Sequence, residues 1–128
     1  MSAGIVGVGI DLVVLTEFEQ LLARRGESFL TRVFSADEIA YCRARHRPVQ
    51  NFAARFAAKE AAFKALGTGW GSGVGWRDVE VVAVWGQAPQ LALHGEFLAR
   101  SQRLGVNQAS VSLTHAGDYA SAVVMLAQ

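Results

Sequence analysis

The stretch that decides the fold is residues 55–69, which read Arg-Phe-Ala-Ala-Lys-Glu-Ala-Ala-Phe-Lys-Ala-Leu-Gly-Thr-Gly. Ala, Leu, Lys and Glu are strong helix formers, so the stretch predicts a long helix that begins after Asn51, a residue suited to cap its amino terminus. Gly67 predicts where this helix ends. The alanines favour close packing against another element. A carboxylate here can hold a hard cation, and the basic side chains and the glycine backbone can receive phosphate oxygens.

Charged residues gather in and before this helix. Glu60 and Lys64 are four positions apart and therefore share a face, although such a pair is most often a solvated surface pair. Six basic residues fall within 22 positions: Arg43, Arg45, Arg47, Arg55, Lys59 and Lys64. Both lysines of the chain belong to this group, which indicates a local anionic ligand.

A second informative segment is residues 4–14, Gly-Ile-Val-Gly-Val-Gly-Ile-Asp-Leu-Val-Val, whose β-branched residues predict a buried strand. Asp11 interrupts it, and two interpretations stand side by side: a paired or metal-bound carboxylate, or a cap for a turn at the strand end. If the long helix crosses this strand, Asp11 and Glu60 converge. Two such carboxylates repel unless a cation lies between them, and Mg²⁺ suits a site with few protein oxygens.

The remaining patterns predict short elements. Capping boxes at Thr16–Glu19 and Ser35–Glu38 indicate two short helices, ending near Arg24 and Arg45. Alternating apolar and polar residues predict four strands, at residues 78–85, 90–94, 109–114 and 119–126. A further helix is predicted between the second and third of these strands, over residues 95–104, and Gly105 ends it. The Gly-x-Gly at residues 7–9 does not extend to a dinucleotide-binding fingerprint. The order of elements predicts one α+β domain over residues 1–128, with a mostly antiparallel sheet packed on the long helix.

Composition sets broad limits. The chain has 128 residues, 52% of them hydrophobic, and a formal net charge of +1, so it suits one packed domain with no general attraction to nucleic acid or membrane. The lone Cys42 fits a reducing compartment. No run of eighteen apolar residues and no signal peptide is recognisable, so we expect a cytoplasmic protein.

Four blocks of the sequence resemble a known family. Residues 7–13, 52–61, 64–69 and 111–115 are similar, in order and spacing, to the holo-[acyl-carrier-protein] synthase type of 4′-phosphopantetheinyl transferase. Trp76–Val81 and the turn ending at Pro89 match as well. The resemblance implies the 4′-phosphopantetheinyl transferase fold. It also implies transfer of 4′-phosphopantetheine from coenzyme A to a serine of an acyl carrier protein, with release of adenosine 3′,5′-bisphosphate.

The resemblance also implies roles for individual residues. Magnesium would be bound by Asp11 and Glu60. Coenzyme A would be bound by Arg47, Arg55, Lys64, Gly67, Thr68, Gly69, Pro89 and His115. The residues expected to act in catalysis are Asp11, Glu60, Lys64 and His115, although a lone histidine at a turn is more often structural. Members of this type form homotrimers with the site between subunits, so Pro89 and His115 would come from the neighbouring chain.

One position departs from the family pattern. The family usually has an arginine where this chain has Glu17, at the surface that meets the acidic carrier protein, so an atypical or polyketide-type carrier is one hypothesis. Two other functions remain open from the sequence: a non-catalytic coenzyme A-binding or carrier-docking module, and a magnesium-dependent phosphohydrolase.

Overall fold

The computed structural model describes residues 4–69 and 72–128. Its elements, in chain order, are β1 (Ile5–Val14), α1 (Leu15–Arg25), α2 (Glu27–Val33), α3 (Ala36–Arg43), α4 (Pro48–Leu66), a 3₁₀ turn (Trp76–Asp78), β2 (Val79–Val82), β3 (Gln90–Leu93), α5 (Gly95–Arg103), β4 (Gln108–Ala116) and β5 (Tyr119–Ala127). The α+β class predicted from the sequence is confirmed. Within the described residues, no helix combines the length and the apolar character needed to cross a bilayer.

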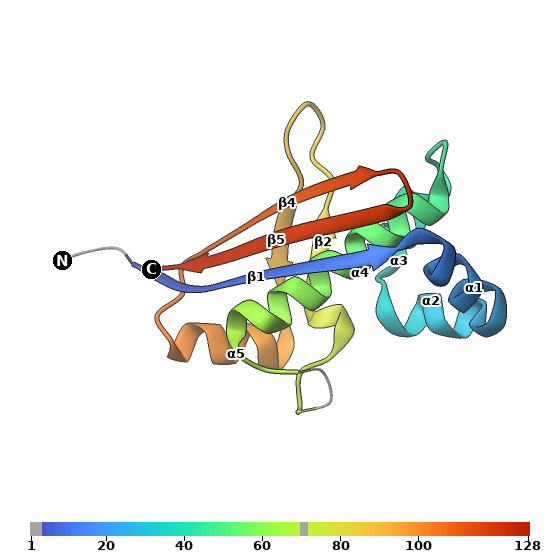
Figure 1. Ribbon diagram of the computed structural model, residues 1–128. Helices are drawn as coiled ribbons and strands as arrows, with labels where there is room; N and C mark the ends of the chain where they lie inside the picture. The colour runs from blue at the N-terminus through green and yellow to red at the C-terminus, as the bar shows by residue number, and fades with distance from the viewer. Residues whose placement is uncertain (1–3, 70–71) are drawn as a thin grey trace.

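The strands form two antiparallel sheets. Three strands pair in the order β1-β5-β4, and β2 pairs with β3 in a separate two-stranded sheet. Figure 1 shows α4 running behind the three-stranded sheet, with α1, α2 and α3 gathered at one end and α5 at the other. Residues 83–89, which connect β2 to β3, form a finger that projects from the rest of the molecule (Figure 1). The predicted hairpin at the carboxyl end is β4 and β5.

Two glycines allow α4 to lie directly on β1. A Cβ atom built on Gly7 would lie 1.8 Å from the carbonyl oxygen of Ala65, and one on Gly9 would lie 1.8 Å from that of Ala61. No side chain fits at such distances, so the Gly-x-Gly pattern serves the contact between strand and helix. This contact carries Asp11, two positions beyond Gly9, to the side of α4.

A buried ion pair lies in the interior of the fold. Lys59 of α4 and Glu38 of α3 have side chains that are both fully buried, with Nζ 2.9 Å from Oε1. Lys59 also donates to the carbonyl oxygens of Val79 and Trp76. Glu38 accepts from the backbone N–H of Ser35 and completes a capping box there, which confirms the box predicted at Ser35–Glu38. The pair therefore ties α3, α4 and β2 together.

Several local predictions were wrong. The long helix was predicted to begin after Asn51, but it begins at Pro48, with Arg47 as its N-cap. Proline is well suited to the first helical position. Thr16 and Glu19 do not form a capping box. Instead Asp118, in the turn between β4 and β5, accepts hydrogen bonds from the Thr16 N–H at 3.2 Å and the Thr16 hydroxyl at 2.8 Å.

Two further elements differ from the predictions. Helix α2 has only seven residues and was not predicted. The strand predicted over 78–85 ends at Val82, after which the finger begins.

Candidate active site

Asp11, Glu60 and Lys64 come together where β1 crosses α4. Lys64 Nζ lies 3.0 Å from Asp11 Oδ1 and donates to the carbonyl oxygen of Ile10, also at 3.0 Å. Burial raises the pKa of Glu60 above its ordinary value, the negative charge of Asp11 raises it further, and the Lys64 ammonium opposes both. The two carboxylates therefore act on one another across the contact between strand and helix, and the single ammonium does not cancel their repulsion.

This arrangement fits a divalent cation of the magnesium type. Carboxylates that repel one another gain when a cation binds between them, and Mg²⁺ accepts one or two protein carboxylates and takes its other oxygens from substrate and water. Among residues 4–69 and 72–128, no group of three or more His, Cys, Asp or Glu side chains is placed to hold a metal. A cation at this point would thus depend on Asp11 and Glu60 together with oxygens that the protein does not supply.

The predicted phosphate-binding loop begins directly beyond these residues. Gly67 ends α4 in the left-handed conformation, at φ 83°, and its N–H reaches the carbonyl oxygens of Phe63 and Lys64. Thr68, which is half-buried, and Gly69, which is exposed, follow Gly67 in the chain. The Thr68 hydroxyl lies 2.6 Å from the Ser72 hydroxyl, so the described part of the loop is folded on itself.

Arg55, Pro89 and His115 belong to a different place. They line a hollow of about 410 Å³ between α4, the finger and β4, together with Tyr41, Gln50 and Asn51. Arg55 is 4% exposed, and its guanidinium carbon lies over the Tyr41 ring, 4.3 Å from the ring centroid. Its Nε is buried and has no hydrogen-bond partner among the described residues. An unpaired buried donor beside a hollow favours an anionic ligand there.

Arg47 lines a second hollow of about 400 Å³, with Thr16, Glu19, Gln50 and Asp118. Gln50 lines both hollows, so they adjoin at the first turn of α4. None of Asp11, Glu60 and Lys64 lines either hollow.

The sequence and the fold both match known proteins. Residues 7–124 match the family model of the 4′-phosphopantetheinyl transferase superfamily. The chain belongs to this superfamily. It is 44% identical over 122 residues to the holo-[acyl-carrier-protein] synthase of Koribacter versatilis, an alignment that covers 95% of this chain and 98% of the relative.

Two crystal structures of holo-[acyl-carrier-protein] synthases share the fold. That from Neisseria meningitidis superposes with a TM-score of 0.86 at 30% identity, covering 96% of this chain and 98% of the other. That from Helicobacter pylori, in complex with coenzyme A, superposes with a TM-score of 0.82 at 29% identity and covers 93% and 98%. The resemblance inferred from the four sequence blocks is thereby confirmed.

In this transferase-family chain the expected site residues divide between two faces of α4. Arg55 and Lys64 are nine positions apart. At 100° per residue this places them about 180° apart around the helix and about 13 Å apart along it. Asp11, Glu60 and Lys64 form one set, and Arg55, Pro89 and His115 form the other. The resemblance implied one coenzyme A site in which Arg55 and Lys64 come from one chain and Pro89 and His115 from its neighbour. Within this chain, Arg55 lines a hollow with its own Pro89 and His115.

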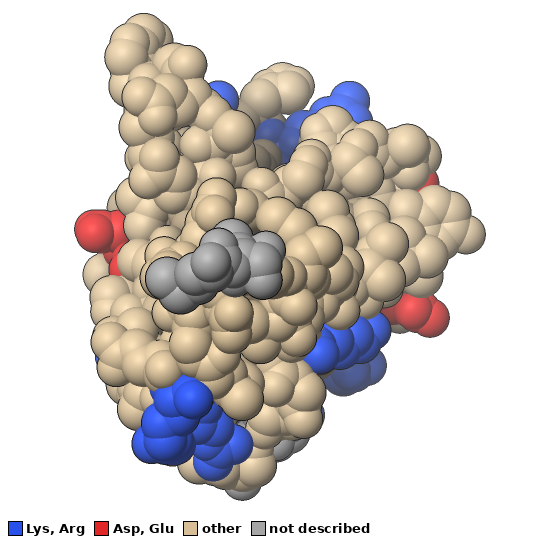
Figure 2. Space-filling view, turned by 90° about the vertical axis from the view of Figure 1, so that its left-hand side faces the viewer, with Lys and Arg blue, Asp and Glu red and all other residues tan. Residues whose placement is uncertain are grey.

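The predicted basic cluster is also divided. Arg43 forms an ion pair with Glu27. The buried Lys59 forms an ion pair with Glu38, so the expectation that Lys59 can receive phosphate was wrong. Figure 2 shows the Lys and Arg side chains of one side of the molecule in separate groups, with uncharged surface between them. Spacing alone could not reveal this, because residues of one long helix point in all directions.

One residue that contacts the predicted phosphate loop was missed. Arg100 of α5 donates to the hydroxyl of Thr68 at 3.2 Å and to the carbonyl oxygen of Ser72. The only signal in the sequence was Glu96, four positions before Arg100, which is typical of a paired helix surface.

Proposed function

We propose that this protein transfers 4′-phosphopantetheine from coenzyme A to a serine of an acyl carrier protein and depends on magnesium. The observation that carries the proposal is the meeting of Asp11, Glu60 and Lys64 where β1 crosses α4, in a chain of the phosphopantetheinyl transferase superfamily. A relative with this fold has been crystallised in complex with coenzyme A, which supports coenzyme A as the donor.

Asp11, Glu60 and Lys64 each have a distinct task in this reaction. The serine oxygen of the carrier attacks the β-phosphorus of coenzyme A, the bond from that phosphorus to the bridging oxygen breaks, and adenosine 3′,5′-bisphosphate leaves. Asp11 and Glu60 would hold the magnesium ion, which when bound neutralises charge on the diphosphate oxygens. Glu60, or a magnesium-held water beside it, accepts the serine proton. Lys64 stabilises negative charge that develops on the bridging oxygen.

The second set binds the nucleotide end of coenzyme A. Arg55, whose guanidinium is held on Tyr41, supplies positive charge for a phosphate in the hollow that it lines, and His115 and Pro89 border the same hollow. Arg47 adds positive charge at the adjoining hollow. Gly67, Thr68 and Gly69, which follow α4 in the chain, would lie beside the diphosphate.

We propose further that the active unit is a homotrimer with its sites between chains. The two residue sets lie on opposite sides of α4, so one chain alone does not present both to one ligand, whereas two adjacent chains do. An apolar surface is available for such a contact, because β1 is not the buried strand that the sequence predicted: Val8, Ile10 and Leu12 are 56%, 64% and 61% exposed. Val123, the partner of Ile10 on β5, continues this surface. Exposed apolar area of this kind favours association.

The decisive experiment combines activity with chain mixing. Wild-type protein, an apo carrier, coenzyme A and Mg²⁺ should give the mass increase of phosphopantetheine on the carrier. Glu60→Ala and Arg55→Ala should each be inactive alone but regain activity when refolded together, because some sites then take an intact half from each chain. No mass shift with any of several fatty-acid and polyketide carriers would favour a non-catalytic module. Breakdown of coenzyme A without a carrier would favour a hydrolase.

The carrier partner is a separate proposal. Glu17 lies exposed in the first turn of α1, where a carboxylate suits the helix dipole but repels an acidic carrier. We infer that the preferred carrier is less acidic at its docking helix than a stand-alone fatty-acid carrier. Glu17→Arg should raise kcat/KM for a stand-alone fatty-acid carrier, and an unchanged value would remove this inference.

A further inference from the structure

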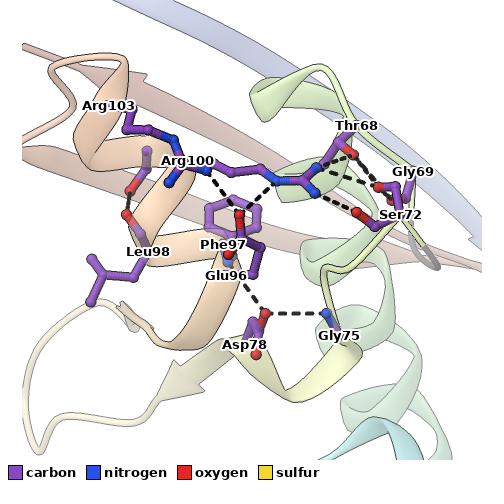
Figure 3. A network of polar contacts seen from close by, with 11 residues as sticks. Thr68, Gly69, Ser72, Gly75, Asp78, Glu96, Phe97, Leu98, Arg100 and Arg103 are labelled. Atoms are coloured by element: carbon purple, nitrogen blue, oxygen red, sulfur yellow. Dashed lines mark hydrogen bonds and ion pairs between the residues drawn. The ribbon is translucent and has the colours of Figure 1, made fainter.

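A polar network joins α5 to the loop that follows α4. The Arg100 guanidinium donates to the Thr68 hydroxyl at 3.2 Å, to the Ser72 hydroxyl at 3.5 Å and to the Ser72 carbonyl oxygen. The Ser72 hydroxyl in turn donates to the carbonyl oxygen of Gly69 at 2.8 Å. Figure 3 shows the guanidinium reaching from α5 across to Thr68, Gly69 and Ser72. One side chain thus contacts the described loop on both sides of residues 70–71.

Arg100 is itself held in place. Glu96, one turn earlier on α5, accepts from Arg100 Nε at 3.1 Å and from Arg103 at 2.9 Å. Hydrogen bonds from Arg103 and Arg100 lower the pKa of Glu96. The guanidinium fork is planar and rigid, and Glu96 occupies its Nε edge while the two terminal nitrogens face the loop. Arg100 therefore approaches the loop in a fixed orientation.

The far end of the loop is fixed from the same helix. Asp78 accepts from the N–H of Gly75 at 3.1 Å and from the N–H of Phe97, in the first turn of α5, at 3.3 Å (Figure 3). A Cβ atom on Gly73 would lie 3.2 Å from Arg100 Nη2, so the loop backbone passes close to the guanidinium. Helix α5 thus holds the loop at Thr68, Ser72 and Gly75.

We propose that Arg100 is a positioning residue for coenzyme A binding. It acts through Thr68 and Gly69, and has no polar contact with Asp11, Glu60 or Lys64 among the described residues. A glycine-rich loop that is free to move would lose conformational entropy when it closes on a diphosphate, and a loop already held in the bound shape avoids much of that loss. Arg100 therefore sets the affinity for coenzyme A and leaves the chemical step alone. This inference rests on the proposed function.

The test compares Arg100→Gln with Arg103→Gln. Both variants remove one arginine that pairs with Glu96, but Arg103 makes no polar contact with the loop among the described residues, so it is the matched control. We expect Arg100→Gln to raise KM for coenzyme A about tenfold with kcat within about threefold of wild type, the size expected for lost hydrogen bonds to a charged group. Arg103→Gln should change both by less than about twofold. Arg100→Lys should not restore KM, because an ammonium lacks the planar fork.

A second measurement does not depend on catalysis. Hydrogen exchange of the backbone amides over residues 67–75, followed by mass spectrometry, should be faster in Arg100→Gln than in wild type and unchanged in Arg103→Gln. Equal KM values and equal exchange for the two variants would overturn the role of Arg100. An inactive wild-type protein in the carrier assay would instead refute the proposed function, and the exchange comparison would still decide whether Arg100 holds the loop.

Discussion

The chain has only two lysines, both in α4 and five positions apart, and they behave in opposite ways. Lys59 is fully buried and meets Glu38 and two carbonyl oxygens, whereas the side chain of Lys64 is 55% exposed beside Asp11. Burial lowers the pKa of Lys59, and the Glu38 carboxylate partly offsets this. The ammonium of Lys59 thus stabilises the packing of α3, α4 and β2, while that of Lys64 remains available to a ligand.

The carboxylates beside the two lysines differ in the same sense. Glu38 has backbone and side-chain donors at both oxygens: Lys59 and Ser35 at one, and the N–H of Val81 at the other. Glu60 is half-buried, feels the charge of Asp11 and keeps a raised pKa. A fully satisfied buried pair indicates a structural role, and two carboxylates that repel one another indicate a place for a cation. The following substitutions test this contrast.

The largest effect is expected from Glu60→Gln. Under the proposed function, loss of this magnesium ligand should lower kcat about 10⁴-fold, which corresponds to about 5 kcal/mol of transition-state stabilisation. The free energy of unfolding should be unchanged or slightly higher, because the substitution removes a carboxylate that burial and Asp11 disfavour. Carrier mass-shift kinetics and urea unfolding measure the two quantities. Glu27→Gln, on an exposed pair with Arg43, is the control, and activity of Glu60→Gln near that control at saturating Mg²⁺ would refute the metal role.

Lys59→Met should affect stability rather than chemistry. Removing the ammonium leaves Glu38 charged and buried, so we expect a loss of about 3–5 kcal/mol in the free energy of unfolding. The double variant Lys59→Met with Glu38→Leu should recover part of this loss, because no uncompensated charge then remains. Urea unfolding of both variants provides the comparison. A single variant as stable as wild type would show that the ion pair contributes little to the fold.

Lys64→Met is the reciprocal substitution on the other lysine. It should lower kcat by about 10- to 100-fold, since one positive group no longer stabilises the bridging oxygen, while the free energy of unfolding changes by less than about 1 kcal/mol, as for an exposed ion pair. Kinetics, unfolding and the oligomer mass should be measured on the same preparation. If turnover and assembly decline together, Lys64 has a structural role like that of Lys59, and the contrast between them is lost.

The contrast between the lysines also marks what a sequence of this kind reveals. The meeting of Asp11 and Glu60 was predictable because a carboxylate in an apolar strand and one in an alanine-rich helix each need a partner. The burial of Lys59 was not predictable, since α4 is covered on most sides and its alanines give no apolar stripe that distinguishes inside from outside. The cap that Asp118 provides for α1 joins residues 102 positions apart, and local pairing rules favoured Glu19 instead.

The subtlest effect should appear in the titration of Glu60 itself. In protein freed of divalent ions with EDTA, NMR of the Glu60 carboxyl should give a pKa above the ordinary 4.5, and Asp11→Asn should lower it, because a like charge is removed while burial remains. A raised carboxyl pKa means that the folded state binds its proton more tightly than the unfolded chain does. Glu60 therefore lowers the free energy of unfolding as pH rises from below 4.5 through its raised pKa. Binding of Mg²⁺ must displace this proton, so the affinity for Mg²⁺ should weaken as pH falls through the same range. If the pKa of Glu60 is ordinary and does not respond to Asp11→Asn, the two carboxylates do not share one site. Lys64 would then simply pair with Asp11, as Lys59 pairs with Glu38, and no cation site would lie beside it.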